Sequence, residues 1–204
     1  MLSQIRPAVV LLALFTLLTG LIYPLAITGV AQVLMPAQAN GSLLRVGDNV
    51  VGSALIGQNF ASDKYFHGRP SATQTQDPAH PDDPSKTIDA PYNAANSVGS
   101  NLGPTSQKLI DRVKAGVDAL HAAGWTGPVP ADAVTTSASG LDPHISPENA
   151  LAQVASVAKA RGLPEDQVRA LVQEQIQGRM LGLIGEPRVN VLRLNMALDA
   201  LTAS

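Results

Sequence analysis

The first part of the chain is an unbroken apolar run. Residues 8–30, AVVLLALFTLLTGLIYPLAITGV, contain no charged side chain, and Arg6 is the only charged residue before Arg45. As a helix, a run of this length extends about 34 Å, which exceeds the ~30 Å hydrocarbon core of a bilayer. Gly20 and Pro24 would weaken a helix in water but are tolerated in membrane spans. The pattern therefore predicts a transmembrane helix over residues 8–30.

Beyond this span, apolar positions occur in short groups separated by turn residues. A hinge over residues 31–44 leads into residues 42–60, where two short apolar runs surround the turn signal Gly47-Asp48-Asn49 and predict a β-hairpin. Residues 71–97 contain several prolines and few large apolar side chains. Because unstructured segments of this length are usually functional or disordered, we expect a contact loop or a mobile loop here.

The C-terminal half carries the three-to-four-residue apolar spacing of amphipathic helices. We predict helices over residues 105–123, 146–161 and 164–178, a last helix capped by Asn190, and a short strand over residues 133–136. The fold class is then α+β: one N-terminal transmembrane helix, followed by a small domain with a β-hairpin or small sheet and about four helices. The apolar helix faces comprise Leu109, Val113, Val117 and Leu120; Leu151, Val154 and Ala158; Val168, Leu171 and Val172; and Val191, Leu194, Leu198 and Leu201.

The N-terminal run also has a second interpretation, a cleaved signal peptide with Ala37-Gln38-Ala39 as its cleavage site. The apolar region of a signal peptide spans only ~7–15 residues, so the longer run here favours an uncleaved anchor. Arg6 and the amino terminus place residues 1–7 in the cytoplasm by the positive-inside rule. Residues 45–204 are then expected to form an extracytoplasmic domain, and the chain to be a single-pass membrane protein.

Composition narrows the function classes further. The net charge is −2, and residues 45–204 carry 13 basic and 16 acidic side chains, so no basic surface is expected for nucleic acid. The absence of cysteine excludes disulfides, zinc–thiolate sites, iron–sulfur clusters and thiol catalysis. No phosphate-binding loop, dinucleotide fingerprint, GxSxG elbow or HExxH pair is present. The four histidines are scattered, so the sequence argues against an intrinsic enzyme.

Three runs remain as candidate sites, each with a structural alternative. Asp142 and His144 suggest a metal or proton-transfer site, but a two-proline turn in which Asp142 bonds to backbone donors explains them better. The turn from Ser97 to Gly103 would hold an anion if it lay at a helix N-terminus, or would be a tight turn with close backbone contact. The run Tyr65-Phe66-His67-Gly68-Arg69-Pro70 would be an exposed docking ridge, or two core aromatics beside a solvated arginine.

Five runs, in the same order along the chain, resemble the C subunit of the Kdp-type potassium-transporting ATPase of bacteria. The resemblance covers essentially the whole chain, after a single N-terminal span. The runs are Val51-Gly52-Ser53-Ala54-Leu55-Ile56-Gly57-Gln58, Tyr65-Phe66-His67-Gly68-Arg69-Pro70-Ser71-Ala72, Gly99-Ser100-Asn101-Leu102-Gly103-Pro104-Thr105, Ser139-Gly140-Leu141-Asp142-Pro143-His144-Ile145-Ser146-Pro147 and Gly185-Glu186-Pro187-Arg188-Val189-Asn190-Val191-Leu192.

The resemblance implies a non-catalytic accessory subunit of a high-affinity, ATP-driven potassium import complex. Its partners would be a channel-like potassium-binding subunit, a P-type ATP-hydrolysing subunit, a small accessory subunit and the lipid bilayer. It would act in assembly and stability, and as a catalytic chaperone that raises the ATP affinity of the hydrolysing subunit. No cofactor is expected on this chain, and ATP would act only through the complex. The candidates for partner or nucleotide contact are Gly57, Gln58, Tyr65, Phe66, Arg69, Ser97, Gly99, Ser100, Asn101, Gly103, Asp142 and His144.

One residue departs from the family pattern. The family usually shows Ser-Gly-Gly-Ser-Asn in a stretch likened to a nucleotide-contact signature, where this chain has Val98 as the second residue. A β-branched valine resists the positive φ that glycine permits, which counts against a nucleotide contact here. Direct ATP contact would also conflict with an extracytoplasmic domain, so any effect on ATP affinity would have to arise by coupling across the complex. The alternative to the subunit is a membrane-anchored exported enzyme or binding protein at the cell envelope.

Overall fold

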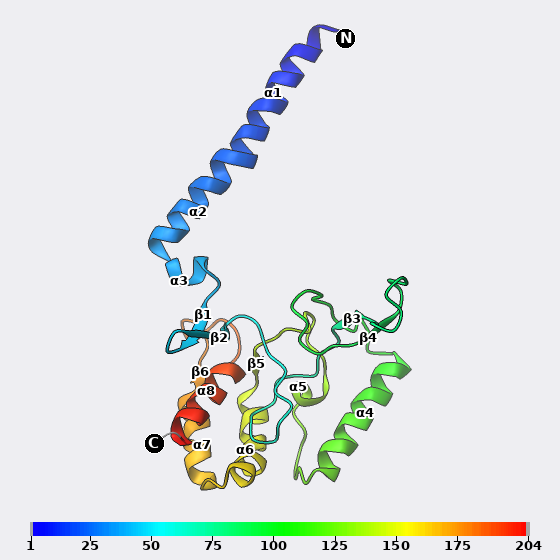
Figure 1. Ribbon diagram of the computed structural model, residues 1–204, viewed down its shortest axis with the longest axis vertical. Coiled ribbons are helices and arrows are strands. Elements are labelled where there is room, and N and C mark those ends of the chain that lie inside the picture. Colours follow the sequence, from blue (N-terminus) through cyan, green and yellow to red (C-terminus); the bar gives the residue numbers. More distant parts are fainter. Residues whose placement is uncertain (1, 203–204) are drawn as a thin grey trace. The chain divides into compact units, whose positions relative to one another are not determined.

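The computed structural model describes residues 2–202, which divide into two compact units (Figure 1). The first unit ends at Ser53 and the second begins at Ala54. The hairpin after the span therefore belongs to the first unit.

The first unit is dominated by one long helix. A 3-10 turn η1 (Leu2–Gln4) leads into α1 (Ile5–Leu17), a π-helical segment η2 (Leu18–Ile22) and α2 (Tyr23–Leu34). Within the described residues, the continuous helix Ile5–Leu34 is the one that is long and apolar enough to cross a membrane, with a mean hydropathy of 2.3. The predicted N-terminal apolar helix is confirmed, and it extends beyond residues 8–30 at both ends.

The π-helical segment has a local cause in Pro24. Proline has no backbone N–H and its ring crowds the carbonyl four residues earlier, which here belongs to Gly20, so the turn before it widens. The Thr19 hydroxyl donates to the carbonyl of Phe15 at 2.7 Å, a bond of the kind that bends helices, at the start of the widened segment. Membrane helices accommodate a proline in this way because nearby groups take up the freed backbone positions.

A short helix and a hairpin complete the first unit. The predicted hinge over residues 31–44 is partly regular: α2 continues to Leu34, α3 (Pro36–Ala39) follows, and β1 (Leu43–Val46) begins within it. β1 pairs antiparallel with β2 (Asn49–Ser53) across a turn in which Gly47 has φ +58°. The predicted hairpin is present, but it ends at Ser53 rather than at residue 60.

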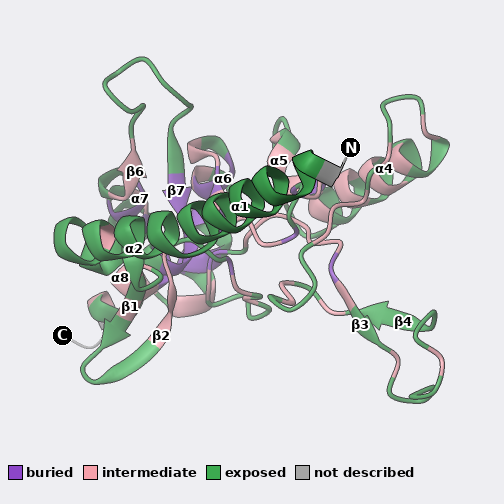
Figure 2. Ribbon diagram, turned by 90° about the horizontal axis from the view of Figure 1, so that it is seen from above, coloured by how far each residue is buried: buried purple, intermediate pink, exposed green. Residues whose placement is uncertain are grey.

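The core of the second unit lies between three helices and a small sheet. β5 (His144–Ile145), β7 (Arg188–Asn190) and β6 (Ile176–Gln177) form an antiparallel sheet in the order β5-β7-β6. Against it pack α6 (Pro147–Arg161), α7 (Glu165–Glu174) and α8 (Val191–Thr202). The buried residues gather around α6 and β7 (Figure 2). The core includes Phe66, Ile145, Val154, Val157, Val168, Val172, Val189, Leu194 and Leu198.

The helical predictions hold for this core. α6 begins with the Ser146 cap, whose side chain accepts from the Asn149 N–H, and it ends at Gly162 in the left-handed conformation. Asn190 caps α8 by accepting from the Arg193 N–H at 3.1 Å. α7 ends at Glu174, four residues before the predicted end, because β6 follows it directly. The α+β fold class is confirmed.

The remaining elements differ from the sequence expectations in two places. The strand predicted over residues 133–136 is wrong: α5 (Ala131–Val134) occupies this position as one helical turn after Pro130. The segment 71–97 is not a plain loop, since β3 (Gln74–Gln76) pairs antiparallel with β4 (Thr87–Asp89). α4 (Gln107–Ala122) is present as predicted, but none of its residues is fully buried.

Candidate functional site

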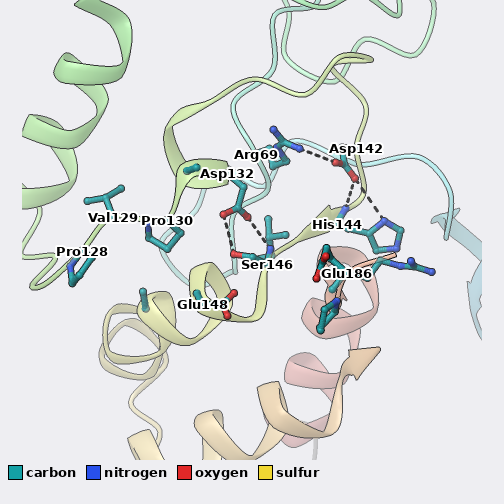
Figure 3. A pocket seen from close by; sticks show the side chains of 15 residues that line it. Arg69, Pro128, Val129, Pro130, Asp132, Asp142, His144, Ser146, Glu148 and Glu186 are labelled. Atoms are coloured by element: carbon teal, nitrogen blue, oxygen red, sulfur yellow. Dashed lines mark hydrogen bonds and ion pairs between the residues drawn. The ribbon is translucent and has the colours of Figure 1, made fainter. Parts of the chain in front are cut away.

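Arg69 meets the neighbouring pair Asp142 and His144, more than 70 residues later in the sequence, in one polar cluster (Figure 3). Arg69 Nη1 donates to Asp142 Oδ2 at 3.3 Å. The backbone N–H of His144 donates to Asp142 Oδ1 at 3.0 Å, and the His144 ring Nδ1 lies 3.6 Å from the same oxygen. Arg69 Nη2 also donates to the backbone carbonyls of Thr135 and Thr136. The cluster therefore joins three separate chain segments.

The carboxylate of Asp142 is held in its ionised form. Burial alone would raise its pKa, but the hydrogen bonds from His144 and the charge of Arg69 outweigh burial and hold the pKa below its ordinary value. The bond from Asp142 to the N–H two residues later is an Asx turn, as the turn interpretation predicts. Among residues 2–202, no group of three His, Asp or Glu side chains is placed to hold a metal ion. The geometry is that of a folded turn stabilised by an arginine.

Tyr92 connects this cluster to two glycines and was missed by the sequence analysis. Its hydroxyl donates to the Arg69 carbonyl at 2.7 Å. A Cβ on Gly57 would lie 2.5 Å from the Tyr92 ring, and a Cβ on Gly68 would collide with the Tyr92 hydroxyl. Burial raises the pKa of Tyr92 to about 12, with a further contribution from the Asp142 charge. Gly57 therefore makes room for Tyr92, and Gln58 beside it is half-buried. A tyrosine in a proline-rich segment carries no sequence signal for this contact.

The turn from Ser97 to Gly103 lies against the segment that precedes Asp142. The Val98 N–H donates to the Ser139 carbonyl at 3.1 Å, and the Ser97 hydroxyl donates to the same carbonyl at 3.0 Å. A Cβ on Gly99 would lie 2.6 Å from the Ala138 carbonyl oxygen. Gly99 is thus needed for close backbone approach, which is the second of the two interpretations that the sequence left open.

The other residues of this turn, from Ser100 to Gly103, differ in exposure and in the groups that they contact. The Ser100 hydroxyl lies 3.2 Å from the Thr136 hydroxyl, which links the turn to the carbonyl acceptors of Arg69. Asn101 is exposed and adopts φ +51°, a conformation that asparagine tolerates better than most residues. No atom lies within 4 Å of a Cβ built on Gly103. α4 begins only at Gln107, so the turn is separated from the helix N-terminus that an anion would use.

The aromatic pair Tyr65-Phe66 divides between core and surface. Phe66 is fully buried, and Asn195 holds its backbone by accepting from its N–H and donating to its carbonyl, both at 2.9 Å. Tyr65 is half-buried beneath the Arg161 guanidinium, whose central carbon lies 4.6 Å from the ring centroid. Phe66 thus packs in the core and is not part of an exposed docking ridge.

Asp132 is a second residue that the sequence analysis missed. Its carboxylate accepts from the Ser146 N–H at 2.7 Å, from the Ser146 hydroxyl at 2.9 Å and from the Asn149 side-chain amide at 3.1 Å. These donors lie at the N-terminus of α6, where an anion binds most favourably. The protein's own carboxylate therefore occupies the position that a bound phosphate would take.

The cluster and the α6 N-terminus line one open cleft of about 900 Å³. Four carboxylates face this cleft against two arginines, so it is net negative when His144 is neutral. Phosphate groups would be repelled by this charge balance, and the donors at the α6 N-terminus already bind Asp132. The charged lining residues are Arg69, Asp132, Asp142, His144, Glu148, Glu186 and Arg188.

Fold and site together define a class of protein. It is a small α+β domain that follows one N-terminal helix long enough to cross a membrane, and its polar cluster bonds to groups of the same domain. The family model of the K+-transporting ATPase c chain, KdpC, matches residues 5–200, and the chain belongs to this family. The resemblance recognised in the sequence is confirmed. As a member of the family, the chain is a subunit of a potassium-transporting ATPase.

Similar proteins match over their full length. The chain is 63% identical over 203 residues to the potassium-transporting ATPase KdpC subunit of Bradyrhizobium diazoefficiens, and the alignment covers 100% of both chains. It is 64% identical over 200 residues to the KdpC subunit of Rhodopseudomonas palustris strain BisB18, covering 98% of this chain and 99% of that one. The KdpC subunit of Methylobacterium nodulans is 63% identical over 201 residues, with 98% of each chain covered.

Proposed function

We propose that the chain is an accessory, non-catalytic subunit that supports assembly and stability of an ATP-driven potassium importer, with ATP hydrolysis on another chain. The observation that carries this proposal is the family match over residues 5–200. The self-bonded polar cluster supports it, because Arg69 and Asp142 are engaged with each other and with backbone groups. The span would hold the subunit in the bacterial inner membrane, and residues 54–204 would lie in the periplasm against a channel-like subunit.

A second part of the proposal is a chaperone role in ATP use. The subunit would raise the apparent ATP affinity of the P-type subunit by a coupling free energy across the complex, without touching ATP. Asp132 already occupies the N-terminus of α6, and the cleft is net negative. Both features disfavour binding of a nucleotide phosphate to this domain, so they support coupling across the complex rather than direct contact with ATP.

Co-purification tests the assembly role. The tagged full-length chain is extracted in mild detergent from potassium-starved cells, and the accompanying chains are identified. We expect a channel-like subunit, a P-type subunit and the small accessory subunit, together with potassium-stimulated ATP hydrolysis. A protein that emerges alone, under conditions that preserve other membrane complexes, would contradict the proposal and favour the alternative of an exported enzyme or binding protein.

Kinetics of the assembled complex test the chaperone role. Asn101→Gly keeps the positive φ and removes the exposed amide, whereas Asp142→Asn removes the charge that Arg69 binds. With intact complex and saturating potassium, we expect a severalfold rise in the apparent KM for ATP for at least one variant, at unchanged kcat. Lys114→Ala, at an exposed position on α4, serves as the control. Unchanged KM values for both variants would refute the coupling role while leaving the assembly role standing.

A further inference from the structure

The loop between β6 and β7 carries the most exposed apolar side chains of the second unit. In residues 180–185, which we call the apolar loop, Met180 is 64% exposed, Leu181 86%, Leu183 83% and Ile184 59%. The sequence of these six residues is MLGLIG, without a charge. Figure 2 shows the loop as an exposed projection from the ends of β6 and β7. Contiguous apolar groups at this exposure mark an interaction site more often than a chance surface.

The backbone of the apolar loop is organised by its own hydrogen bonds. The Met180 N–H donates to the Ile184 carbonyl at 2.9 Å, and the Ile184 N–H donates back to the Met180 carbonyl at 3.0 Å. Gly182 bonds to Arg179 and Leu183 to Met180, both at 3.1 Å. A main-chain polar group that is bonded internally can enter an apolar site without losing a bond to water. These bonds therefore reduce the number of main-chain groups that docking would have to desolvate.

Leu181 is unusual for the turn that it occupies. Its φ is +53°, a left-handed conformation in which glycine, asparagine and aspartate are favoured over leucine. The side chain is 86% exposed, so packing within the chain does not repay the backbone strain. Asparagine would suit this backbone conformation better, so the exposed leucine points to a contact outside the chain.

We propose that the apolar loop inserts into an apolar groove on another protein subunit of the same ATPase complex. This inference rests on the proposed function, because it takes its partner from the assembly to which the family belongs. Docking would bury all four side chains and fix the second unit on its partner. An interface anchored by a few large, centrally placed side chains is the common arrangement in protein complexes.

Two observations favour a protein groove over the bilayer surface. The loop has a fixed shape, held by its own hydrogen bonds, which a complementary groove can recognise and a fluid lipid surface cannot. Residues 54–204 carry 12 basic and 15 acidic side chains, so charge does not draw this unit to anionic lipid.

The ion pair at the base of the apolar loop also favours a protein partner. Arg179 Nη2 lies 2.6 Å from Glu186 Oε2, which joins the two ends of the loop by an ion pair. Both side chains are solvent-exposed, and their charges cancel at the rim of the apolar residues. An apolar centre with a charged rim is the usual composition of a protein–protein interface.

Co-purification of a double variant tests the proposal. Leu181→Asn combined with Leu183→Gln removes the apolar tip, and the asparagine suits the positive φ, so the full-length chain should melt at an unchanged temperature in detergent. We expect recovery of the other ATPase chains to fall at least tenfold. Ile110→Gln, at a 50% exposed position on α4, is the matched control and should leave recovery unchanged. Wild-type recovery by the double variant would overturn the docking role.

The same experiment separates this inference from the proposed function. If the wild-type chain recovers no ATPase chains, the proposed function fails and the docking role falls with it. If only the double variant loses them while Ile110→Gln keeps them, both stand. If both variants lose them equally, the effect is not specific to the apolar loop, and the docking role is overturned.

A spin label distinguishes protein from lipid. Because the chain has no cysteine, Leu181→Cys provides a single attachment site for a nitroxide in the assembled complex. We expect low accessibility both to oxygen, which concentrates in lipid, and to a water-soluble nickel chelate. High oxygen accessibility would place the loop in lipid, and high nickel accessibility would leave it in water; either result overturns the protein-docking proposal. A label at Ala95, an exposed position, provides the solvent reference.

Discussion

At the scale of single residues, two glycines of one motif have opposite roles. A Cβ at position 99 would lie 2.6 Å from the Ala138 carbonyl oxygen, whereas a Cβ at position 103 would have no neighbour within 4 Å. Gly99→Ala should therefore lower the free energy of unfolding by about 1–3 kcal/mol through overpacking. Gly103→Ala, whose φ is not positive, should leave it within about 1 kcal/mol. Thermal unfolding of both full-length variants in detergent measures the difference, and equal melting temperatures would contradict it.

Asp142 gives a prediction of pH dependence. Its pKa in the folded protein lies below the ordinary value of 3.8, so the ionised carboxylate stabilises the fold above that pH and loses this effect as pH falls through the folded pKa. Asp142→Asn should be less stable than the wild type at pH 7. The difference should stay constant down to about pH 5 and shrink below about pH 4. Melting temperatures between pH 7 and pH 3 test this, and a difference that grows on acidification would contradict it.

The candidate residues show what a sequence can and cannot indicate about a site. The motif runs identified Arg69, Asp142 and Gly99, and the Asx turn at Asp142 follows from local rules. The ion pair between Arg69 and Asp142 joins positions 73 residues apart, and no local pattern encodes such a pairing. Tyr92 and Asp132 were missed for the same reason, since their contacts depend on segments that meet only in the folded chain.

At the scale of elements, the N-terminus of α6 is stabilised by a residue outside the helix. Asp132 accepts three hydrogen bonds there, two of them from Ser146. Asp132→Ala should cost about 1–3 kcal/mol, because it leaves partly buried donors without an acceptor. Glu148→Ala, an exposed change in the first turn of the same helix, should cost less than about 1 kcal/mol. Urea unfolding of the full-length variants provides the comparison, and an equal cost would show that Asp132 adds nothing beyond a helix-end charge.

Elements were predicted well where apolar spacing extends over several turns and poorly where it does not. α6, α7 and α8 bury the faces that their periodicity predicts, at Val154, Leu171 and Leu198 for example. The sheet was not predicted in detail because its strands have only two or three residues and pair across long intervals. The strand expected over residues 133–136 includes three β-branched residues, Val134 to Thr136, which favour a strand by local propensity alone. The segment instead forms a helical turn that brings the Asp132 carboxylate to the N-terminus of α6.

At the scale of the whole molecule, the two units point to two environments. The helix Ile5–Leu34 exposes apolar side chains on all its faces, such as Leu12 at 70% and Leu25 at 64%, which suits lipid and not water. The second unit has a buried apolar core and a surface with 12 basic and 15 acidic side chains, which suits water. The helix therefore has the composition of a membrane span, and the second unit has that of a water-exposed domain.

The positive-inside rule predicts that the segment before the span, with Arg6 and the amino terminus, lies in the cytoplasm and that the second unit lies on the other side of the membrane. Since the chain has no cysteine, Ser3→Cys and Ala95→Cys each introduce a single thiol at an exposed position. In spheroplasts, a membrane-impermeant maleimide should label Ala95→Cys and should label Ser3→Cys only after lysis. The reverse pattern would place the second unit in the cytoplasm and remove the topological reason for excluding direct ATP contact. Labelling of both before lysis would instead indicate leaky cells, and the mass of the chain shows separately whether the anchor has been cleaved.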